Sequence, residues 1–376
     1  MSSRLSCEFL APDDARWRTL LDRVSHDFYH LPSYVQMCAR IEHGEAGAFH
    51  VADGGNELLL PMIVREVPDL DGEGTRGWRD AASPYGYPGP LILAGGPEAN
   101  AAAFVDRALS ALLVLMREQR ILTAFVRFHP LLPPPPGAFA AHGTLVMHGH
   151  TVSIDLMRPA EEIWAGVRIN HQRQIKMLER RADVCTDEDR QWALLPDFIA
   201  AYQGTMDRVK ATASYYFDAD YFSALRRALG DRLHLMVTKF GERVAAGVVV
   251  SECCGFVQYH LAATAPEFFK ERPQKVLCRN TWLWAQGRGA KVFHLGGGVG
   301  GREDGLFHFK AGFSDRRHPF YTWRACSQLS VYERLVAAWL EENRGGSATN
   351  VFFPAYRQPT AAHQGGTASK SHRGEP

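Results

Sequence analysis

The stretch "VFHLGGGVGGREDGLFHFKAGFS", Val292 to Ser314, contains the residues best suited to chemistry in this chain. Lys310 lies between Phe309 and Ala311, and a lysine in apolar surroundings is partly desolvated, which suits it to stabilise developing negative charge. An ordinary lysine whose stem crosses an apolar helix surface gives the same pattern. Asp304 could orient Lys310 or accept a hydrogen bond from an amine, and a turn-capping carboxylate explains it as well.

The glycine run of this stretch, Gly296 to Gly301, formally satisfies the G-x-G-x-x-G pattern of a dinucleotide-binding loop. That fingerprint requires a helix that starts inside the motif and an acidic residue about 20 positions later. Here Gly305 and Gly312 interrupt the chain again, and no Gly-Lys-Ser/Thr follows as in a P-loop. We therefore interpret the run as a turn at a strand end, where Gly297 and Gly298 let a ligand approach because they have no Cβ.

Two histidines and an aromatic loop are further candidates. His129 and His260 are of the residue type that serves as a base near neutral pH, although with 16 histidines in the chain a structural role fits each as well. Tyr85 and Tyr87, in the Pro- and Gly-rich segment "SPYGYPGPLIL", predict either one wall of a binding pocket or a plain turn.

Alternating helices and strands must position these residues, which indicates a mixed α/β protein. Apolar periodicity predicts helices over residues 13–26, 98–120, 159–182, 195–206 and 218–229, and a basic helix over 271–289. Three apolar strands over 233–264 precede the basic helix, and a strand ending in the glycine run follows it. Both halves have a similar element order, so we expect domains at 1–152 and 153–358, each a mixed sheet flanked by helices, and a disordered tail at 359–376.

Composition limits the function classes. A chain of 376 residues with 46% hydrophobic and 22% charged residues is typical of globular proteins, and neither a membrane-spanning run nor a signal peptide is expected, which favours the cytoplasm. The 7 cysteines, Cys253 and Cys254 adjacent, have no disulfide or zinc spacing, so we expect reduced structural thiols and no metal site. Arginine, alanine and glycine are abundant, which suggests a GC-rich bacterial genome.

Charge points to a local rather than a global anion-binding surface. A net charge of +1 gives no general case for nucleic acid, but residues 267–291 hold six basic and two acidic residues. A second basic segment spans 168–183, and the two could hold a polyanion or form solvated helix faces.

Four segments resemble the FemABX family of aminoacyl-tRNA-dependent aminoacyltransferases and its GNAT-like relatives. They are "NHQRQIKMLERRA" (170–182), "YQGTMDRVKATASYYF" (202–217), "VQYHLAAT" (257–264) and the glycine-lysine block that begins this section. The resemblance implies two GNAT-like domains, a tRNA-linked amino acid as donor, and no other cofactor. The chain departs from the family in having His129 before Pro130, where Asp-Pro is common, and in lacking the long helical arm.

The resemblance also implies roles for individual residues. Lys310, preceded by Phe309, matches the family lysine that neutralises charge on the reacting ester, and Arg208, Tyr216 and Tyr259 fall at positions lining the acceptor cleft. The basic segment, with Lys270, Arg272, Lys275 and Arg279, would face the tRNA acceptor stem.

Three functions remain open from the sequence. The first is aminoacyl transfer from charged tRNA to an amine on a cell-wall precursor peptide or a small metabolite. The second is acyl-CoA-dependent N-acyl transfer, although "APEFFKERPQKVL" lacks the glycine turn that binds the pyrophosphate in such GNAT enzymes. The third is a binding protein that has lost catalysis.

Overall fold

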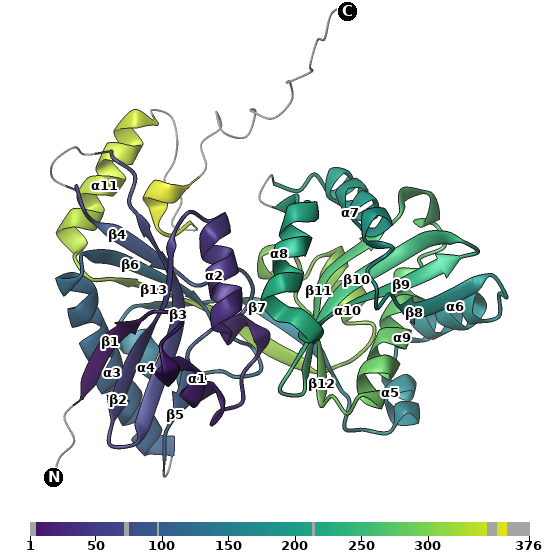
Figure 1. The fold of residues 1–376 in the computed structure, drawn as a ribbon, viewed down its shortest axis with the longest axis horizontal. Helices are drawn as coiled ribbons and strands as arrows, with labels where there is room; N and C mark the ends of the chain where they lie inside the picture. Colours follow the sequence, from purple (N-terminus) through teal and green to yellow (C-terminus); the bar gives the residue numbers. More distant parts are fainter. Residues whose placement is uncertain (1–4, 71–74, 96–97, 213–214, 344–351, 359–376) are drawn as a thin grey trace, which may run out of the picture.

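The computed structural model describes residues 5–70, 75–95, 98–212, 215–343 and 352–358. Their thirteen strands form one sheet with the order β1-β2-β3-β4-β6-β13-β7-β12-β11-β10-β9-β8, and β5 pairs with β3 (Figure 1). We call β1 to β6 with their helices the N-terminal half, and β8 to β12 with theirs the C-terminal half. The expected mixed α/β class is confirmed, and the expected tail, 359–376, lies outside the described residues.

The N-terminal half begins with a strand and two short helical segments. Its strands are β1 (Ser6–Leu10), β2 (Glu45–Asp53), β3 (Asn56–Glu66), β4 (Arg79–Ala82), β5 (Leu91–Leu93) and β6 (Ile121–Arg127). Its helices are α1 (Ala15–Leu21), η1 (Phe28–His30), α2 (Pro32–Ile41), α3 (Glu98–Glu118) and α4 (Pro136–Ala141). The predicted hairpin at residues 53–55 is confirmed, because β2 and β3 pair in antiparallel register from Asp53 and Asn56.

The C-terminal half follows the long strand β7 (Thr144–Asp155). Its strands are β8 (Val184–Glu188), β9 (Leu233–Phe240), β10 (Arg243–Cys253), β11 (Phe256–Thr264) and β12 (Val292–Gly296). Its helical segments are α5 (Ala160–Gly166), α6 (Ile169–Glu179), α7 (Leu195–Val209), α8 (Ala219–Leu229), η4 (Gly230–Arg232), η5 (Pro266–Phe268), α9 (Gln274–Gly287), η6 (Val299–Gly301) and α10 (Gly305–Lys310). The helix expected over 159–182 is two helices, because the backbone is extended at Val167 and Arg168.

The chain then returns to the N-terminal half. Strand β13 (Arg317–Cys326) inserts between β6 and β7, and α11 (Leu329–Glu342) and η7 (Ala355–Arg357) follow it (Figure 1). Tyr356 is buried beside Leu122 of β6, and Arg357 pairs with Asp80 of β4. The domain limits 1–152 and 153–358 stay a prediction, but the residues from β13 onward pack on the N-terminal half.

The apolar core differs between the two faces of the sheet. On one face a single buried cluster joins α1, η1 and α2 to α7, α8 and strands β9 to β11, and α2 packs against α8. On the other face the two halves have separate cores, one under α3 and one under α6 and α9. The shared core and the continuous sheet hold the two halves together.

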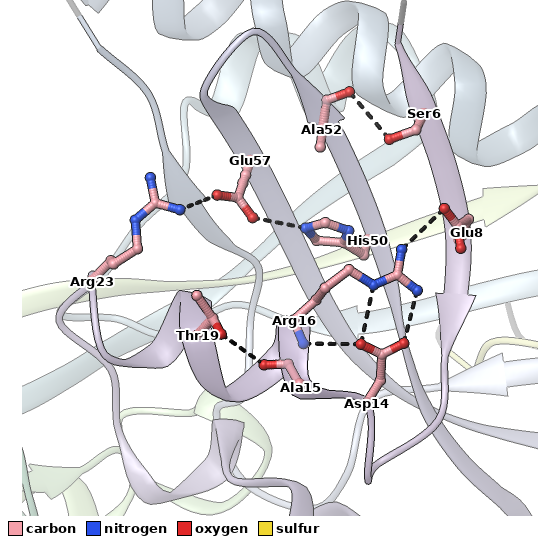
Figure 2. A network of polar contacts seen from close by, with 10 residues as sticks. All are labelled: Ser6, Glu8, Asp14, Ala15, Arg16, Thr19, Arg23, His50, Ala52 and Glu57. Atoms are coloured by element: carbon pink, nitrogen blue, oxygen red, sulfur yellow. Dashed lines mark hydrogen bonds and ion pairs between the residues drawn. The ribbon is translucent and has the colours of Figure 1, made fainter.

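Ion pairs fix the start of the chain against this sheet (Figure 2). Arg16 of α1 contacts Asp14, the N-cap of the same helix, and Glu8 of β1. Arg23, just after α1, pairs with Glu57 of β3. Glu57 also accepts a hydrogen bond from the buried His50 at 2.9 Å. Exposed pairs of this kind add little stability.

Candidate active site

Two parallel strands of the C-terminal half separate at the centre of the site. β11 and β12 pair only from Phe256 opposite Val292 to Gln258 opposite His294. Beyond that point β11 contains a bulge at His260 in its pairing with β10, and β12 ends in the glycine turn. Diverging strands leave backbone groups available to a ligand, and a bulge redirects side chains at such a place.

The glycine turn contacts Lys310 directly. Lys310, at the end of α10, is 8% exposed, and its Nζ donates a hydrogen bond to the carbonyl of Gly297 at 2.6 Å. Gly296 has a φ of 76°, and a Cβ there would lie 3.3 Å from that Nζ. Burial lowers the pKa of Lys310 to about 8, although the carboxylate of Asp304 opposes this shift. The buried, weakly basic amine fits the charge-stabilising role better than that of a lysine reaching solvent.

Asp304 forms the N-cap of α10. Its Oδ1 accepts from the backbone N–H of Phe307 at 2.9 Å, and its Oδ2 accepts from that of Val299 at 3.0 Å. A Cβ on Gly298 would lie 2.5 Å from the same carboxylate, so Gly298 is needed for this close approach. Because both oxygens are occupied by backbone amides, the geometry favours a capping role for Asp304 over direct proton transfer.

A buried polar network borders the paired ends of β11 and β12. Asp27, at the start of η1, accepts hydrogen bonds from Nε2 of His129 at 3.0 Å and from the amide of Gln258. The Oε1 of Gln258 accepts from Nδ1 of His294 at 2.7 Å. All four residues are at most 2% exposed, and they come from three distant parts of the chain.

This network separates the roles of two histidines. The Nδ1 of His129 accepts from the backbone N–H of Leu131 at 3.1 Å, so with Nε2 donating to Asp27 no lone pair remains to take a substrate proton. The hypothesis that His129 is the base therefore does not fit the geometry. His294 donates a hydrogen bond from Nδ1 to Gln258, so its Nε2 carries the lone pair. Among the described residues this Nε2 has no hydrogen-bond partner.

Aromatic side chains of the N-terminal half pack against histidines of β11 and β12. The ring of Tyr87 lies 5.3 Å from that of His294, and its hydroxyl is near Gly296; burial raises the pKa of Tyr87 to about 12. Tyr85 contacts His260 with 5.9 Å between ring centres. His260 is half-buried, faces the hydroxyl of Tyr221 at 3.3 Å, and has its pKa lowered to about 4 by burial, so it is neutral at pH 7.

A cationic cavity lies beside Phe309 at the N-terminus of α9. Its volume is about 290 Å³, and the residues lining it are Arg208, Thr264, Phe269, Arg272, Gln274, Lys275 and Phe309, none of them acidic. The guanidinium of Arg208 lies 4.2 Å over the ring of Phe269. Burial, together with the charges of Arg272 and Arg168, lowers the pKa of Lys275 to about 8. Three cations at the positive end of a helix dipole attract an anion.

The other predicted binding residues lie outside this cavity. Tyr259 donates to Gln274 at 2.6 Å and so supports its wall, whereas Tyr216 is exposed and donates to Asp207 at 2.9 Å. Arg279 pairs with Glu179 at 2.7 Å, which occupies its charge. Lys270 is exposed on the loop before α9.

Asp27, Gln258 and His294 are the site residues that sequence reasoning missed. Gln258 and His294 each lie inside an apolar strand, where a buried polar side chain needs a partner. That signal was visible in the sequence, but the partner Asp27 is more than two hundred positions away.

Comparisons with known proteins agree with this architecture. Residues 165–310 match the family model of the acetyltransferase (GNAT) domain, so the matched segment ends at Lys310. No curated protein matches the chain.

Several solved structures have the same fold at low identity. FemX has a TM-score of 0.61 at 12% identity, covering 81% of this chain and 93% of its own. The C-terminal domain of a putative lysylphosphatidylglycerol synthetase from Agrobacterium fabrum has a TM-score of 0.52 at 13% identity, covering 86% and 95%. L-PGS from Bacillus licheniformis has a TM-score of 0.50 at 13% identity, covering 89% and 98%.

The similarity to a GNAT acetyltransferase domain thus lies in residues 165–310, in the C-terminal half. Over most of its length the chain has a fold like that of FemX. In the part of the chain that the structure describes, no helix is both long enough and apolar enough to cross a membrane.

Proposed function

We propose that this protein transfers an aminoacyl group from charged tRNA to an amine and so forms an amide. The observation that carries the proposal is the cationic cavity lined by Phe309, the residue that precedes Lys310 in α10. The acceptor is an amine on a cell-wall precursor peptide or on a small metabolite.

The cavity suits the end of a nucleic acid. Arg208, Arg272 and Lys275 match a phosphate, while Phe269 and Phe309 offer ring faces on which a base stacks. Its volume of about 290 Å³ lies at the lower end of small-molecule sites, a size that suits one nucleotide. The basic loop with Lys270 extends the positive surface on which an acceptor stem would lie.

The chemistry requires little acid-base assistance because the donor is an activated ester. The neutral amine attacks the ester carbonyl, a C–N bond forms, the C–O bond to the ribose breaks, and the departing ribose oxygen takes up a proton while the amine loses one. Lys310, as a cation, would stabilise the tetrahedral oxyanion, with the glycine turn allowing the ester to approach it. His294, with its free Nε2, replaces His129 as the candidate to relay the proton.

Acyl-CoA is the second candidate donor, supported by the GNAT family match. Two features of the loop before α9 argue against it. The N-cap of α9 is Pro273, which has no N–H to donate to a pyrophosphate. The residue before it, Arg272, has a φ of 55°, a conformation that favours glycine. A phosphate in this cavity would be held by side chains.

The test is filter binding of the purified protein to a mixed pool of radiolabelled aminoacyl-tRNA, with acetyl-CoA as competitor. We expect retention that CoA does not displace, and transfer of label to an amine acceptor in a form resistant to mild base. Lys275→Met should weaken retention at least about tenfold by removing a desolvated phosphate partner.

Lys239→Met, at a half-buried lysine of β9 outside both basic segments, is the matched control and should bind like wild type. If CoA abolishes retention and the amine is acylated only with acyl-CoA, the donor is acyl-CoA and not charged tRNA. Binding without any transfer would assign it to the class of binding proteins.

A further inference from the structure

Two adjacent cysteines and a histidine meet at the boundary between the halves, where the histidine directly precedes Asp27 of the buried network. Cys253 ends β10 and is buried, Cys254 follows it in the turn to β11 and is exposed, and His26 lies in the segment between α1 and η1. One ligand atom from each lies within 4.8 Å of the other two. No other group of three His, Cys, Asp or Glu residues among the described residues is so arranged.

The distance between two of the three ligands fits a tetrahedral metal. The Sγ of Cys254 is 3.5 Å from Nδ1 and 3.6 Å from Nε2 of His26. Zinc bonds of about 2.3 Å to sulfur and about 2.0 Å to nitrogen place the two ligand atoms of a tetrahedron about 3.5 Å apart. The pair therefore needs little movement to share an ion.

The histidine is already in the required tautomer. Its Nδ1 lies 3.1 Å from the carbonyl oxygen of Val24, an acceptor, so Nδ1 carries the proton. The Nε2 lone pair is then available, and a backbone carbonyl on the far ring nitrogen is the usual support of a metal-binding histidine. Arg23, held by Glu57, fixes the same segment (Figure 2).

The turn that carries the cysteines has an uncommon residue. Cys254 and Gly255 have φ angles of 48° and 84°, the geometry of a two-residue hairpin turn that favours Asn-Gly. A cysteine in the left-handed region is uncommon, and such strain gathers where the side chain has a function. The turn presents the Cys254 thiol toward His26.

We propose that His26, Cys253 and Cys254 bind one Zn²⁺ ion that joins the two halves of the molecule. Binding releases the two thiol protons to solvent, so the two thiolates neutralise the ion, and water fills the fourth position. Two thiolates and an imidazole favour zinc over magnesium or calcium, which prefer oxygen ligands. From the sequence we expected no metal site, because the ligands are 228 positions apart and show no zinc spacing.

The test measures zinc in the full-length protein, purified under reducing conditions without chelator and dialysed against micromolar Zn²⁺. We expect about one zinc per chain by elemental analysis, and a thiolate-to-metal absorption band in the near ultraviolet when Co²⁺ replaces Zn²⁺. Cys254→Ser and His26→Gln should each reduce bound zinc by more than about tenfold. Cys254 is exposed, so its substitution spares the core.

Cys185→Ser is the matched control, since Cys185 is an exposed thiol on β8, and it should keep the zinc. The loss of the cobalt band in Cys254→Ser, with an unchanged circular dichroism spectrum, separates the metal site from a folding defect. A wild-type protein without zinc, equal zinc in wild type and Cys254→Ser, or a mass showing a Cys253–Cys254 disulfide after purification would overturn the proposal.

Discussion

At the scale of single residues, burial determines which charged groups are suited to chemistry. Lys310 and Lys275 both have a pKa lowered to about 8, mainly because burial disfavours the cation. They serve different partners, since Lys310 faces the glycine turn and Lys275 lines the cationic cavity. Their roles in the proposed transfer can therefore be separated by kinetics.

Replacing Lys310 should cost activity without costing stability. In Lys310→Met the stem is kept and a desolvated cation is removed, but the Gly297 carbonyl loses its donor, so we expect the melting temperature to change little. Turnover should fall by about a hundredfold or more, as when one charge-stabilising donor is lost. Steady-state transfer and thermal denaturation check both parts, and wild-type turnover in this variant would remove Lys310 from the mechanism.

The reaction should lose rate in mild alkali. As pH rises through about 8, Lys310 releases its proton and turnover falls, whereas a lysine of ordinary pKa would stay charged to about pH 10. Deprotonation of Lys275 in the same range should instead raise the KM for the donor. A pH profile of Lys275→Met that keeps the fall in turnover but loses the rise in KM would confirm this division.

The two histidines of the buried network should respond differently to substitution. His294→Asn can keep a donor toward Gln258, because its amide takes the place of Nδ1, but it removes the free Nε2, so we expect turnover to fall about a hundredfold. His129→Leu leaves Asp27 without its imidazole donor inside the core and should destabilise the fold by about 1–3 kcal/mol. Paired denaturation and rate measurements decide, and unchanged turnover in folded His294→Asn would exclude it as the relay.

At the scale of elements, glycines determine where the turn before α10 lies. Gly301 has a φ of 82°, and a Cβ there would lie 2.7 Å from the Cβ of His148 on β7. Gly305, by contrast, begins α10 and has nothing within 4 Å of its Cβ position. One turn thus contains both a required and a replaceable glycine.

Alanine substitution should reveal that difference. Gly301→Ala combines a steric clash with an unfavourable backbone angle, so we expect a loss of about 1–3 kcal/mol and reduced turnover as Lys310 shifts. Gly305→Ala should be neutral or stabilise by up to about 1 kcal/mol, because alanine restricts the unfolded chain. Urea denaturation of both variants measures this, and equal stabilities would contradict the close packing of the turn.

Local patterns predicted much of these elements, and long-range contacts account for what was missed. Apolar periodicity indicated the hairpin at 53–55 and the strands around the basic helix, because turn glycines and alternation are local signals. The break at Val167 was missed, since it depends on packing: Arg168 donates its N–H to Gly312. The pairing of Asp27 with His129 and Gln258 could not be read from spacing, because the fold alone brings them together.

At the scale of the whole molecule, β13 returns the chain to the N-terminal half. Trp323 of this strand is fully buried and donates its Nε1–H to Phe139 of α4 at 2.9 Å. β13 also pairs with β7, and α2 shares a core with α8. We therefore expect the two halves to unfold as one unit.

Substituting Trp323 tests that cooperativity. Trp323→Ala should lower the free energy of unfolding by about 3–5 kcal/mol, and the single transition should move as a whole. Trp284→Ala, at a half-buried tryptophan of α9, should cost less. Calorimetry in which only one of two separate transitions moves would show that the halves unfold independently.

The position of β13 also affects how the chain is made. When β7 leaves the ribosome, the facing edges of β6 and β7 have no partner until residue 326 is synthesised, 171 residues after β7 ends at residue 155. At about 5–20 residues per second this interval is roughly 10 to 30 s. Two open strand edges persist for that time, and open edges invite pairing with other chains. The nascent protein thus needs protection before its last strand arrives, and a chain terminated before Arg317 would keep those edges permanently.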